Sequence, residues 1–282
     1  YGPQVAVVGL APSGGRLAPE VRQSVAEALA AGLSVASGLH TKLAADPELA
    51  ALVQPGCWIW DLRQEPAQLQ VAAARAAALP CRRVLALGSD MSVGKMSTAL
   101  ELTAAARSQG LDARFVATGQ GGILISGGGI ALDAVRIDYA AGAVEAALLQ
   151  TAEGAGPAAI VFVEGQGSFC HPGSSASLPL LRGSQPTELL LVHRAGQQAI
   201  RNLPDIPLPP LPQLISTCEA LAALATPQAA KPPRVKAIAL NTGHLEGDAA
   251  ELEIKKANQL TGLPCGDPVR GDRELLLAAL LS

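Results

Sequence analysis

The chain has 282 residues, of which 49% are hydrophobic but only 2% aromatic, and its formal net charge is −3. This length is enough for two domains, while the charge provides no basic field of the kind that holds nucleic acid. No apolar run approaches the roughly 18 residues that a membrane span needs, and no basic segment followed by an apolar one opens the chain. We therefore expect a cytoplasmic protein that acts on a small molecule, without nucleic-acid or membrane partners.

The composition also bears on packing and assembly. Aliphatic side chains must fill the core, which suits sheets covered by Ala- and Leu-rich helices, and the apolar excess predicts a subunit interface and hence a homo-oligomer. The chain begins with Tyr1, not Met, a few residues before a predicted strand, so we expect the first domain to lack part of its natural start. The cysteines lie far apart without metal-ligand spacing, which predicts reduced structural thiols: Cys57, Cys81, Cys170, Cys218 and Cys265.

The first part of the chain alternates short apolar runs with helical segments. Helices are predicted to begin at Pro19 and Pro47, because proline is favoured in the first helical turn. Each apolar run ends in Gly-rich or polar residues, which is typical of strands that lead into loops. Alternating strands and helices favour a parallel, doubly wound sheet. The predicted strands are Val5–Leu10, Leu33–Ser37 and Cys57–Trp60.

An Ala- and Gln-rich segment, Gln64–Leu79, follows these elements, and Pro80 ends it. Its composition predicts a connecting helix. We place the domain boundary there, which gives a first domain over residues 1–79 and a second over residues 80–282.

The second domain repeats the strand–helix alternation more strongly, and we expect the Pro-rich Leu203–Pro212 to be a surface connector without structure of its own. Its predicted strands are Arg83–Leu87, Ala113–Thr118, Ala158–Val163, Leu189–His193, Val235–Leu240 and Gly262–Val269. Its predicted helices are one that ends near Gln109, Asp138–Gln150, Ala249–Thr261 and Glu274–Leu281.

A phosphate-binding loop is predicted between the first strand and the first helix of this domain. It runs from Gly88 to Lys95, and glycine allows its backbone to curl so that successive N–H groups face phosphate oxygens at the helix N-terminus. Lys95 adds a positive charge toward the same oxygens. The loop therefore predicts a ligand with phosphates, either a nucleotide or coenzyme A. The alternative is a Gly-capped turn with a solvated lysine. The residues expected to hold the cofactor are Gly88, Ser89, Asp90, Ser92, Val93, Gly94, Lys95, Met96 and Ser97.

Two features depart from the common phosphate-loop pattern. Five residues separate Gly88 from Gly94, where four are usual, and Met96 follows the lysine where Ser or Thr normally ligates Mg²⁺. Either Ser97 replaces the missing hydroxyl or no metal is needed. The loop is thus a strong indication of phosphate binding and a weak one of nucleotide hydrolysis.

The loop spacing, with Asp90 inside it, resembles dethiobiotin synthetase and its relatives. Glu164, at the end of a strand and before Gly165, resembles the glutamate that helps hold magnesium in those ligases. Asn241 resembles the asparagine that such proteins place on a purine base, so we include it among the cofactor-binding candidates. In that case Ser97 and Glu164 are the residues that would hold magnesium. This resemblance covers the second domain only.

A longer series of motifs is spread in order over nearly the whole chain. The motifs are Ala11-Pro-Ser-Gly-Gly-Arg-Leu17, Ser37-Gly-Leu-His40, Asp46-Pro-Glu-Leu49, Trp60-Asp-Leu-Arg63, Gly88-Ser-Asp90, Gly94-Lys-Met-Ser97, Ala117-Thr-Gly-Gln-Gly121, Ile130–Asp138, Glu164-Gly-Gln-Gly-Ser168, His171-Pro172, Leu181-Arg-Gly-Ser-Gln185 and Asp267-Pro-Val-Arg270. Together they resemble the D-glutamate N-acetyltransferase family, long catalogued only as a domain of unknown function.

The resemblance implies an α/β protein with a Rossmann-like N-terminal domain and a P-loop NTPase-like C-terminal domain built on a parallel sheet. It implies acetyl transfer from acetyl-CoA to the amine of D-glutamate, with the P-loop around the phosphates of the coenzyme. Met96 agrees with this expectation, since no magnesium–nucleotide complex need be held.

Such a reaction needs a base that deprotonates the amine. Glu164 follows a strand beside the P-loop, where ligands bind in open α/β sheets, and it is either a base, a metal ligand or a turn cap. His171 is held in a loop by Pro172, and neutral imidazole suits proton removal near pH 7, although such a histidine is often only solvated. Asp133 and Asp138 are further candidate bases, and one of them is a candidate helix cap.

The thioester carbonyl needs hydrogen-bond donors. Backbone N–H groups in Gly119–Gly122 and Gly165–Ser168 are candidates, because glycine permits close approach; the alternative is a pair of tight turns. Cys170 beside His171 makes an acyl-enzyme another, less favoured alternative, since sequence neighbours rarely point at one another.

A dicarboxylic acceptor needs cations. Arg16 and Arg63 follow strand ends in the first domain and are suited to bidentate carboxylate binding, unless they form surface ion pairs, and His40 lies in a similar loop. If they face the cleft between the domains, the first domain binds the amino acid and the second the coenzyme. The candidate substrate-binding residues are Ser13, Gly14, Arg16, His40, Arg63, Gly119, Gln120, Gln166, Gly167 and Ser168.

Two rival functions remain open at this point. One is an ATP- and magnesium-dependent ligase or kinase like dethiobiotin synthetase, which Asp90, Glu164 and Asn241 favour and Met96 opposes. The other is a nucleotide-sensing regulatory protein without catalytic activity. The charged loops of both domains favour a small substrate and therefore an enzyme.

Overall fold

The first domain is a small parallel sheet with helices packed on one face. The computed structural model describes residues 2–10, 17–227 and 230–282. The strands pair in parallel in the order β1-β2-β3, and leucines and valines of α1 and of the loop around α2 fill the core beneath them. The bounds are β1 Val5–Val8, α1 Pro19–Ala30, β2 Ser34–Ser37, the 3₁₀ helix η1 Leu43–Ala45, α2 Pro47–Ala50 and β3 Ile59–Asp61.

The connector between the domains is not the helix that its composition predicts. Only the 3₁₀ helix η2, Arg75–Ala78, is regular in residues 62–79. The carboxylate of Glu145, which is fully buried, accepts hydrogen bonds from the backbone N–H groups of Ala73 and Arg75 and from the Arg75 side chain. Those N–H groups are therefore used to fasten the connector to a helix of the second domain, and not to form a helix of its own.

The second domain is built on a sheet in which six strands of the described chain run parallel, in the order β11-β10-β7-β4-β6-β5. Five strands were predicted over nearly the same residues, and the sixth, β11, is a short part of its predicted range. Their carboxyl ends share one edge, so the loops after β4, β6 and β10 lie near one another. The bounds are β4 Arg82–Gly88, β5 Ala113–Val116, β6 Ile160–Val163, β7 Glu188–Arg194, β10 Arg234–Asn241 and β11 Cys265–Gly266.

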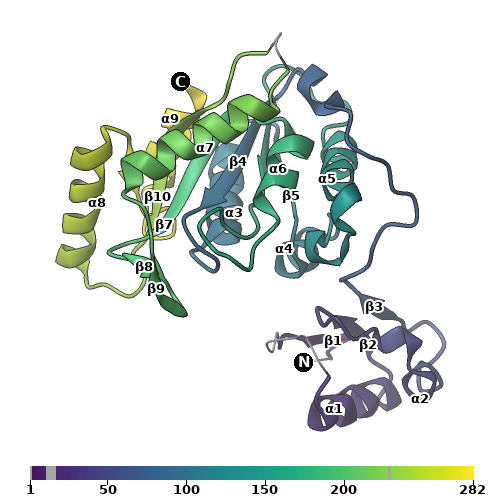
Figure 1. The fold of residues 1–282 in the computed structure, drawn as a ribbon. Coiled ribbons are helices and arrows are strands. Elements are labelled where there is room, and N and C mark those ends of the chain that lie inside the picture. Colours follow the sequence, from purple (N-terminus) through teal and green to yellow (C-terminus); the bar gives the residue numbers. More distant parts are fainter. Residues whose placement is uncertain (1, 11–16, 228–229) are drawn as a thin grey trace.

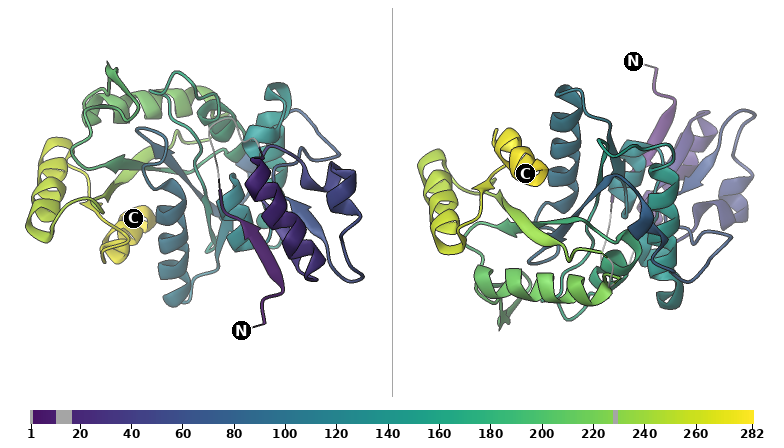
Figure 2. Two further views of the ribbon diagram at one scale, coloured as in Figure 1. Left: turned by 90° about the horizontal axis from the view of Figure 1, so that it is seen from below. Right: turned by 90° about the horizontal axis from the view of Figure 1, so that it is seen from above.

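Helices cover both faces of this sheet, as the near-continuous burial of its strands requires. One hydrophobic core lies between the sheet and α5, α6, α7 and α8, and another lies between the sheet and α3 and α9. The two views of Figure 2 show α3 and α9 on one side and α7 on the other. The bounds are α3 Lys95–Ser108, α4 Gln120–Ser126, the 3₁₀ helix η3 Leu132–Ala134, α5 Ile137–Thr151, α6 Ser177–Ser184, α7 Leu211–Ala225, α8 Gly247–Thr261 and α9 Arg273–Leu281.

The Pro-rich segment expected to be an unstructured connector is structured. Its residues Leu203–Pro207 form strand β9, which pairs antiparallel with β8, Ala199–Ile200. Pro210 then precedes α7, whose first turn accommodates Pro212 because the N–H that proline lacks has no partner inside a helix at that position. The prediction of a structureless connector over 203–212 is therefore wrong.

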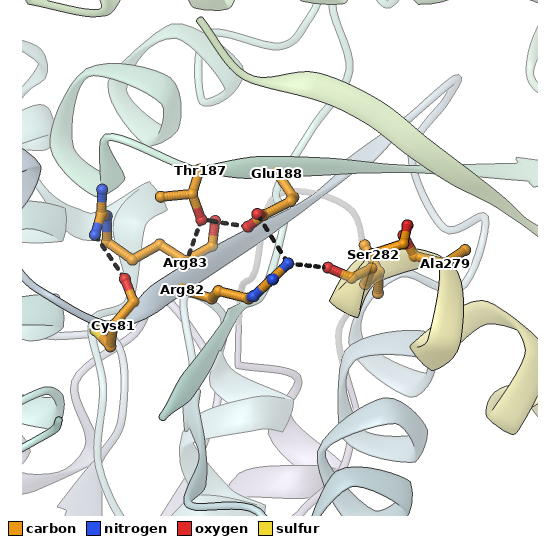
Figure 3. Close-up of polar contacts among 8 residues, drawn as sticks. Cys81, Arg82, Arg83, Thr187, Glu188, Ala279 and Ser282 are labelled. Carbon is orange, nitrogen blue, oxygen red and sulfur yellow. Dashed lines mark hydrogen bonds and ion pairs between the residues drawn. The ribbon is translucent and has the colours of Figure 1, made fainter. Parts of the chain in front are cut away.

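The opposite end of the sheet is held by arginines at the start of β4 (Figure 3). Arg82 donates from Nη1 to Glu188 and to the carbonyl of Leu280, which ties β4 to β7 and to α9. Arg83 is buried and donates to the carbonyls of Leu79, Cys81 and Gln185. The end of the connector is thereby fixed to the sheet, away from the loops that bear the candidate site.

The two domains meet at an apolar joint. In Figure 1 the small domain lies beside α4, and the connector passes from β3 up along α5. Ala36 and Leu62 of the first domain pack with Ala117, Ile123 and Ala131 of the second. No helix in the described parts of the chain combines the length and the apolarity needed to cross a membrane.

Candidate functional site

The loop between β4 and α3 has the backbone of a phosphate cradle. Ser92 and Gly94 have positive φ angles of 55° and 109°, a conformation that costs glycine least. A glycine is also favoured at position 88, because a Cβ there would lie 2.9 Å from the backbone carbonyl oxygen of Asp90 and 2.6 Å from the ammonium of Lys95. The loop then enters α3 at Lys95, so its amides and the positive end of the helix dipole face the same space.

Lys95 is buried behind the loop that it serves. Its Nζ donates to the carbonyl of Asp90 at 2.9 Å, and only 7% of the residue is exposed. Burial lowers the pKa of Lys95 to about 8, although the nearby carboxylates of Asp90 and Glu164 oppose the shift. An anionic ligand would offset that desolvation, so the lysine is suited to a phosphate.

Asp90, which was predicted to bind the cofactor, uses its carboxylate on the protein itself. One oxygen accepts from the backbone N–H of Met91 at 2.7 Å. The other accepts from Gln197 at 2.7 Å and from the backbone N–H of Arg201 at 2.9 Å. Asp90 therefore joins the P-loop to Gln197, in the turn before β8, and to Arg201, in the hairpin formed by β8 and β9.

Ser89 also supports the loop from behind. The Nδ1 atom of His193, at the end of β7, lies 2.8 Å from the Ser89 hydroxyl. The hydroxyl of Ser168 donates to the Ser89 carbonyl at 2.8 Å. Burial lowers the pKa of His193 to about 4, so its ring is neutral near pH 7. His193 and Gln197 were not predicted, because each becomes relevant only through contacts across more than 100 residues.

Glu164 directly follows β6 and lies beside the P-loop, 3% exposed. Its Oε2 accepts from the backbone N–H groups of Thr118, at 2.9 Å, and Gly119, at 3.2 Å, and its Oε1 accepts from Gln166 at 3.3 Å. Burial raises its pKa above the ordinary glutamate value, against the effect of those hydrogen bonds and of Lys95. Because the Gly119 amide binds this carboxylate, it is not a free donor for a thioester oxygen.

These groups surround a cavity of about 450 Å³, the P-loop cavity. Lys95 and Glu164 both line this cavity. Met96 also lines it and occupies the position where a hydroxyl would normally meet magnesium. Ser97, one residue later, also lines it. Its lining is Met91, Ser92, Gly94, Lys95, Met96, Ser97, Gly119, Gln120, Gly121, Glu164, Gly165, Gln166 and Gly167.

A smaller cavity of about 140 Å³ adjoins it and shares Gly94 and Ser97. Asn241 lines this cavity, but its amide donates to the carbonyl of Val93 at 3.1 Å and accepts from the Gly243 N–H at 3.1 Å. Asn241 thus fastens the P-loop to the end of β10, and its two polar atoms are already bonded where a purine was expected to meet them.

A third cavity of about 380 Å³, the side cavity, shares Met91, Gln166 and Gly167 with the P-loop cavity. One wall is the loop after β6, which Ser168 holds by donating its N–H to the Ser174 hydroxyl at 3.0 Å. The opposite wall is apolar except for Asp133. The full lining is Met91, Leu132, Asp133, Val135, Ile137, Ala140, Gln166, Gly167, Gly173, Ser174, Ser175, Ala176 and Pro179.

The loop beyond Ser168 offers little for acid–base chemistry. The Nδ1 atom of His171 accepts the N–H of Gly173 at 3.0 Å, so a neutral His171 bears its proton on Nε2 and has no free basic nitrogen. Burial raises the pKa of Cys170, which leaves its thiolate scarce. Asp138 is exposed in the first turn of α5, where a carboxylate stabilises the helix dipole, and it lines none of the three cavities.

The predicted cations of the first domain lie at the domain boundary. The Nη1 atom of Arg63 contacts both His40 and Asp133, so the second domain supplies the anion. Gln120 of the P-loop cavity lies against Gly38, two residues from His40. Ser13, Gly14 and Arg16 lie outside the described residues.

Metal binding has limited support in this arrangement. Within residues 2–10, 17–227 and 230–282, no group of three or more His, Cys, Asp or Glu side chains is arranged to hold a metal ion. Ser97 and Glu164 line the same cavity and would be its ligands if magnesium entered with a nucleotide.

Two family models match the chain and cover most of it. The model described as a Rossmann-like domain of unknown function, DUF1611_N, matches residues 1–65. The model described as a P-loop domain of unknown function, DUF1611_C, matches residues 70–277.

Named relatives extend over the same length. A D-glutamate N-acetyltransferase of Tritonibacter scottomollicae is 36% identical over 281 residues, 99% of this chain and 81% of the relative. Another D-glutamate N-acetyltransferase, from a Pseudoalteromonas species, is 34% identical over 281 residues, which are 99% of this chain and 82% of that relative. A crystal structure of a DUF1611 family protein from Anabaena variabilis superimposes with a TM-score of 0.92 at 51% identity, over 99% of this chain and 80% of that one.

Proposed function

This chain belongs to the DUF1611 family, and from that premise we propose that it is an N-acetyltransferase that transfers acetyl from acetyl-CoA to the amine of an acidic amino acid, with D-glutamate as the first candidate. The observation that supports this most is a buried carboxylate of raised pKa, Glu164, in the same cavity as the phosphate cradle and Lys95. Relatives of that name at 34–36% identity along nearly the entire chain support the reaction class.

The coenzyme is the ligand that agrees best with the P-loop cavity. Its diphosphate would lie on the curled backbone at Ser92–Lys95, and Met96 removes the hydroxyl that a magnesium–nucleotide complex would use. Shared lining residues join the three cavities into one path. Coenzyme A has a nucleotide end, a diphosphate and a long, partly apolar arm, and such a path accommodates a ligand of that shape.

Glu164 is the base in this proposal. A carboxylate with a raised pKa accepts a proton from the ammonium more readily than an ordinary glutamate. As the nitrogen bonds to the acetyl carbon, the thioester C–S bond breaks; one ammonium proton passes to Glu164 and another to the departing thiolate. Gln166, hydrogen-bonded to Glu164, orients the carboxylate. The acceptor's carboxylates would lie toward Arg63 and His40 of the first domain.

The test is CoA release from acetyl-CoA, detected as free thiol, with D- and L-amino acids as acceptors. We expect stimulation by D-glutamate, a loss of at least about a hundredfold in kcat for Glu164→Gln, and weak coenzyme binding for Lys95→Ala. A Glu251→Gln variant, which alters an exposed carboxylate on α8, is the control for the loss of one negative charge.

The ligase alternative retains one specific observation, namely that Ser97 and Glu164 line one cavity. It predicts magnesium-dependent ATP turnover that Ser97→Ala abolishes. ATP turnover without CoA release from any amine would overturn the acetyltransferase proposal. Binding of a nucleotide without turnover of either donor would instead favour a sensor.

A further inference from the structure

The Arg63 guanidinium lies between the two domains with part of its hydrogen-bonding capacity unused. Its side chain is 11% exposed. Nη1 contacts the Nε2 atom of His40 and the carboxylate of Asp133, but Nε is buried and has no partner among the described residues. A buried donor without an acceptor is costly, and a guanidinium is suited to a carboxylate that bonds two of its nitrogens at once.

The two residues that contact Arg63 have different roles. Arginine stays protonated and donates, so His40 accepts at Nε2 and bears its own proton on Nδ1. That neutral ring orients the guanidinium without satisfying its charge. Asp133 neutralises the charge, yet its side chain is 47% exposed and faces the side cavity. His40 is exposed as well, but only Asp133 bears a negative charge and lines the side cavity, so Asp133 is the one of the two that can bind a cationic group there.

Backbone hydrogen bonds link the neighbourhood of Asp133 to the proposed base. The N–H of Leu132, the neighbour of Asp133, donates to the carbonyl of Thr118 at 3.1 Å, and the N–H of Thr118 donates to Glu164. Thr118, in the loop after β5, therefore connects the segment that bears Asp133 to the Glu164 carboxylate. Gln166 lines both cavities and bonds Glu164, so the two positions share a wall.

We infer that Arg63 and Asp133 form a receptor for an α-amino acid, in which Arg63 binds the α-carboxylate and Asp133 binds the α-ammonium. This inference rests on the proposed acetyl transfer. The Arg63–Asp133 ion pair is then the resting state of the receptor, and the zwitterion replaces each partner with a group of the same charge. The ammonium is held at the wall that leads to Glu164, and the unused Nε donor gains a carboxylate oxygen.

The same arrangement explains how product would leave. Acetylation converts the ammonium into a neutral amide, as the C–N bond forms, the C–S bond breaks and two protons depart. The amide leaves Asp133 without a cation while Arg63 is within reach, so the ion pair re-forms at the expense of the product. The receptor should therefore bind the free amino acid more tightly than its N-acetyl derivative.

The experiment compares three ligands by calorimetry with the full chain: D-glutamate, glutarate, which has the two carboxylates but no amine, and N-acetyl-D-glutamate. We expect the unmodified protein to prefer D-glutamate over both others. Asp133→Asn keeps the shape of the side chain and removes its charge. It should weaken the binding of D-glutamate by about tenfold to a hundredfold, while glutarate binds no more weakly than before. Arg63→Lys should weaken all three ligands, and Glu251→Gln should change none.

Retention of the preference for D-glutamate in Asp133→Asn would overturn the inference, as would an equal loss of D-glutamate and glutarate. A parallel thiol-release assay separates this failure from failure of the proposed function. If D-glutamate stimulates CoA release but the Asp133 variant keeps its selectivity, only the receptor is refuted. If no amine stimulates CoA release, the acetyltransferase proposal is refuted, and the calorimetric comparison alone decides whether the receptor binds an amino acid.

Discussion

Lys95 shows how one buried residue links the P-loop to pH. Its pKa of about 8 results from burial, and bound phosphate should raise that pKa by supplying the missing anion. The affinity for 3′-phospho-ADP, which lacks the coenzyme's thiol, should be nearly constant below pH 8 and should fall about tenfold per pH unit above it, with proton uptake on binding. Calorimetry between pH 7.5 and 9.5 in buffers of different ionisation enthalpy measures both effects.

Lys95→Arg provides the control, because a guanidinium stays protonated throughout this range. Its affinity should be lower, since the guanidinium does not fit behind Gly88, but it should lose the pH dependence. An unmodified protein whose affinity does not change between pH 7.5 and 9.5 would show that Lys95 does not meet the phosphates.

His193 should make the free energy of unfolding depend on pH, with the loss of stability on the acid side. Its folded-state pKa of about 4 lies below the ordinary value of 6.5 because the ring is buried, so the unfolded chain binds a proton that the folded chain excludes. The free energy of unfolding should therefore be highest above pH 6.5. It should decline as the pH falls toward 4, and the part of this decline due to His193 should be about 3 kcal/mol. Urea unfolding of the protein and of His193→Gln, from pH 7.5 to 4.5, isolates the difference.

The variant should be less stable at pH 7.5, where Ser89 loses its imidazole partner, but its stability should decline less steeply toward acid pH. The exposed His244 serves as a matched control, and His244→Gln should keep the unmodified slope. Equal slopes for the His193 variant and the unmodified protein would contradict the prediction.

Local sequence identified the residues at strand ends but not what each one contacts. Glu164 and Lys95 were predicted because their types follow strands and glycines in a recognisable order. Asp90 and Asn241 were predicted by the same logic, yet both use their polar atoms to brace the loop. Position along the chain places a side chain at the edge of the sheet, whereas its partner depends on packing between segments far apart, such as Asp90 and Gln197.

At the level of elements, the connector depends on one buried carboxylate. Glu145 accepts the N–H groups of Ala73 and Arg75 and an ion pair from the Arg75 side chain. Glu145→Ala should lower the free energy of unfolding by about 3 kcal/mol, because these buried donors lose their acceptor. Arg75→Ala should cost less, since that side chain is 46% exposed and only one of the partners is removed. Urea unfolding of both variants checks the order, and the reverse order would contradict it.

The same contact explains why the composition of the connector led to a wrong prediction. Residues 64–79 have the composition of a helix, but their amides bind Glu145, and a Cβ at Gly142 would overlap the Gln70 backbone, so the connector lies directly on α5. Similarly, α4 begins at Gln120 within the Gly119–Gly122 stretch, where we expected backbone donors or a tight turn and not a helix, and β9 lies in a Pro-rich stretch. In each case tertiary contacts outweighed local propensity. By contrast, α1, α3, α5, α8 and α9 and the buried strands of the large sheet lie over nearly the predicted residues, whereas α6 and the long α7 were not predicted.

At the scale of the molecule, the proposed reaction depends on how the two domains are held together. The joint between them is small and consists of Ala36, Leu62, Ala117, Ile123 and Ala131. Its residue Leu62 immediately precedes Arg63 in the sequence. Because the residues proposed to hold the coenzyme belong to the second domain, and the proposed acceptor residues Arg63 and His40 to the first, the joint would set the distance between acceptor and donor. A shift of the first domain relative to the second should slow the reaction, since the rate depends steeply on the positions of the reacting atoms.

Leu62→Ala should therefore impair acceptor use more than coenzyme binding. Leu62 is 6% exposed, and its truncation leaves a void in the joint, so we expect the KM for the acceptor to rise by about tenfold while the dissociation constant for 3′-phospho-ADP stays within about twofold. Leu62→Met, which nearly conserves the volume, should restore most of the acceptor affinity. Steady-state kinetics with both substrates, together with calorimetry, measures the split. Equal losses for acceptor and coenzyme would mean that the joint stabilises the second domain and does not position the first.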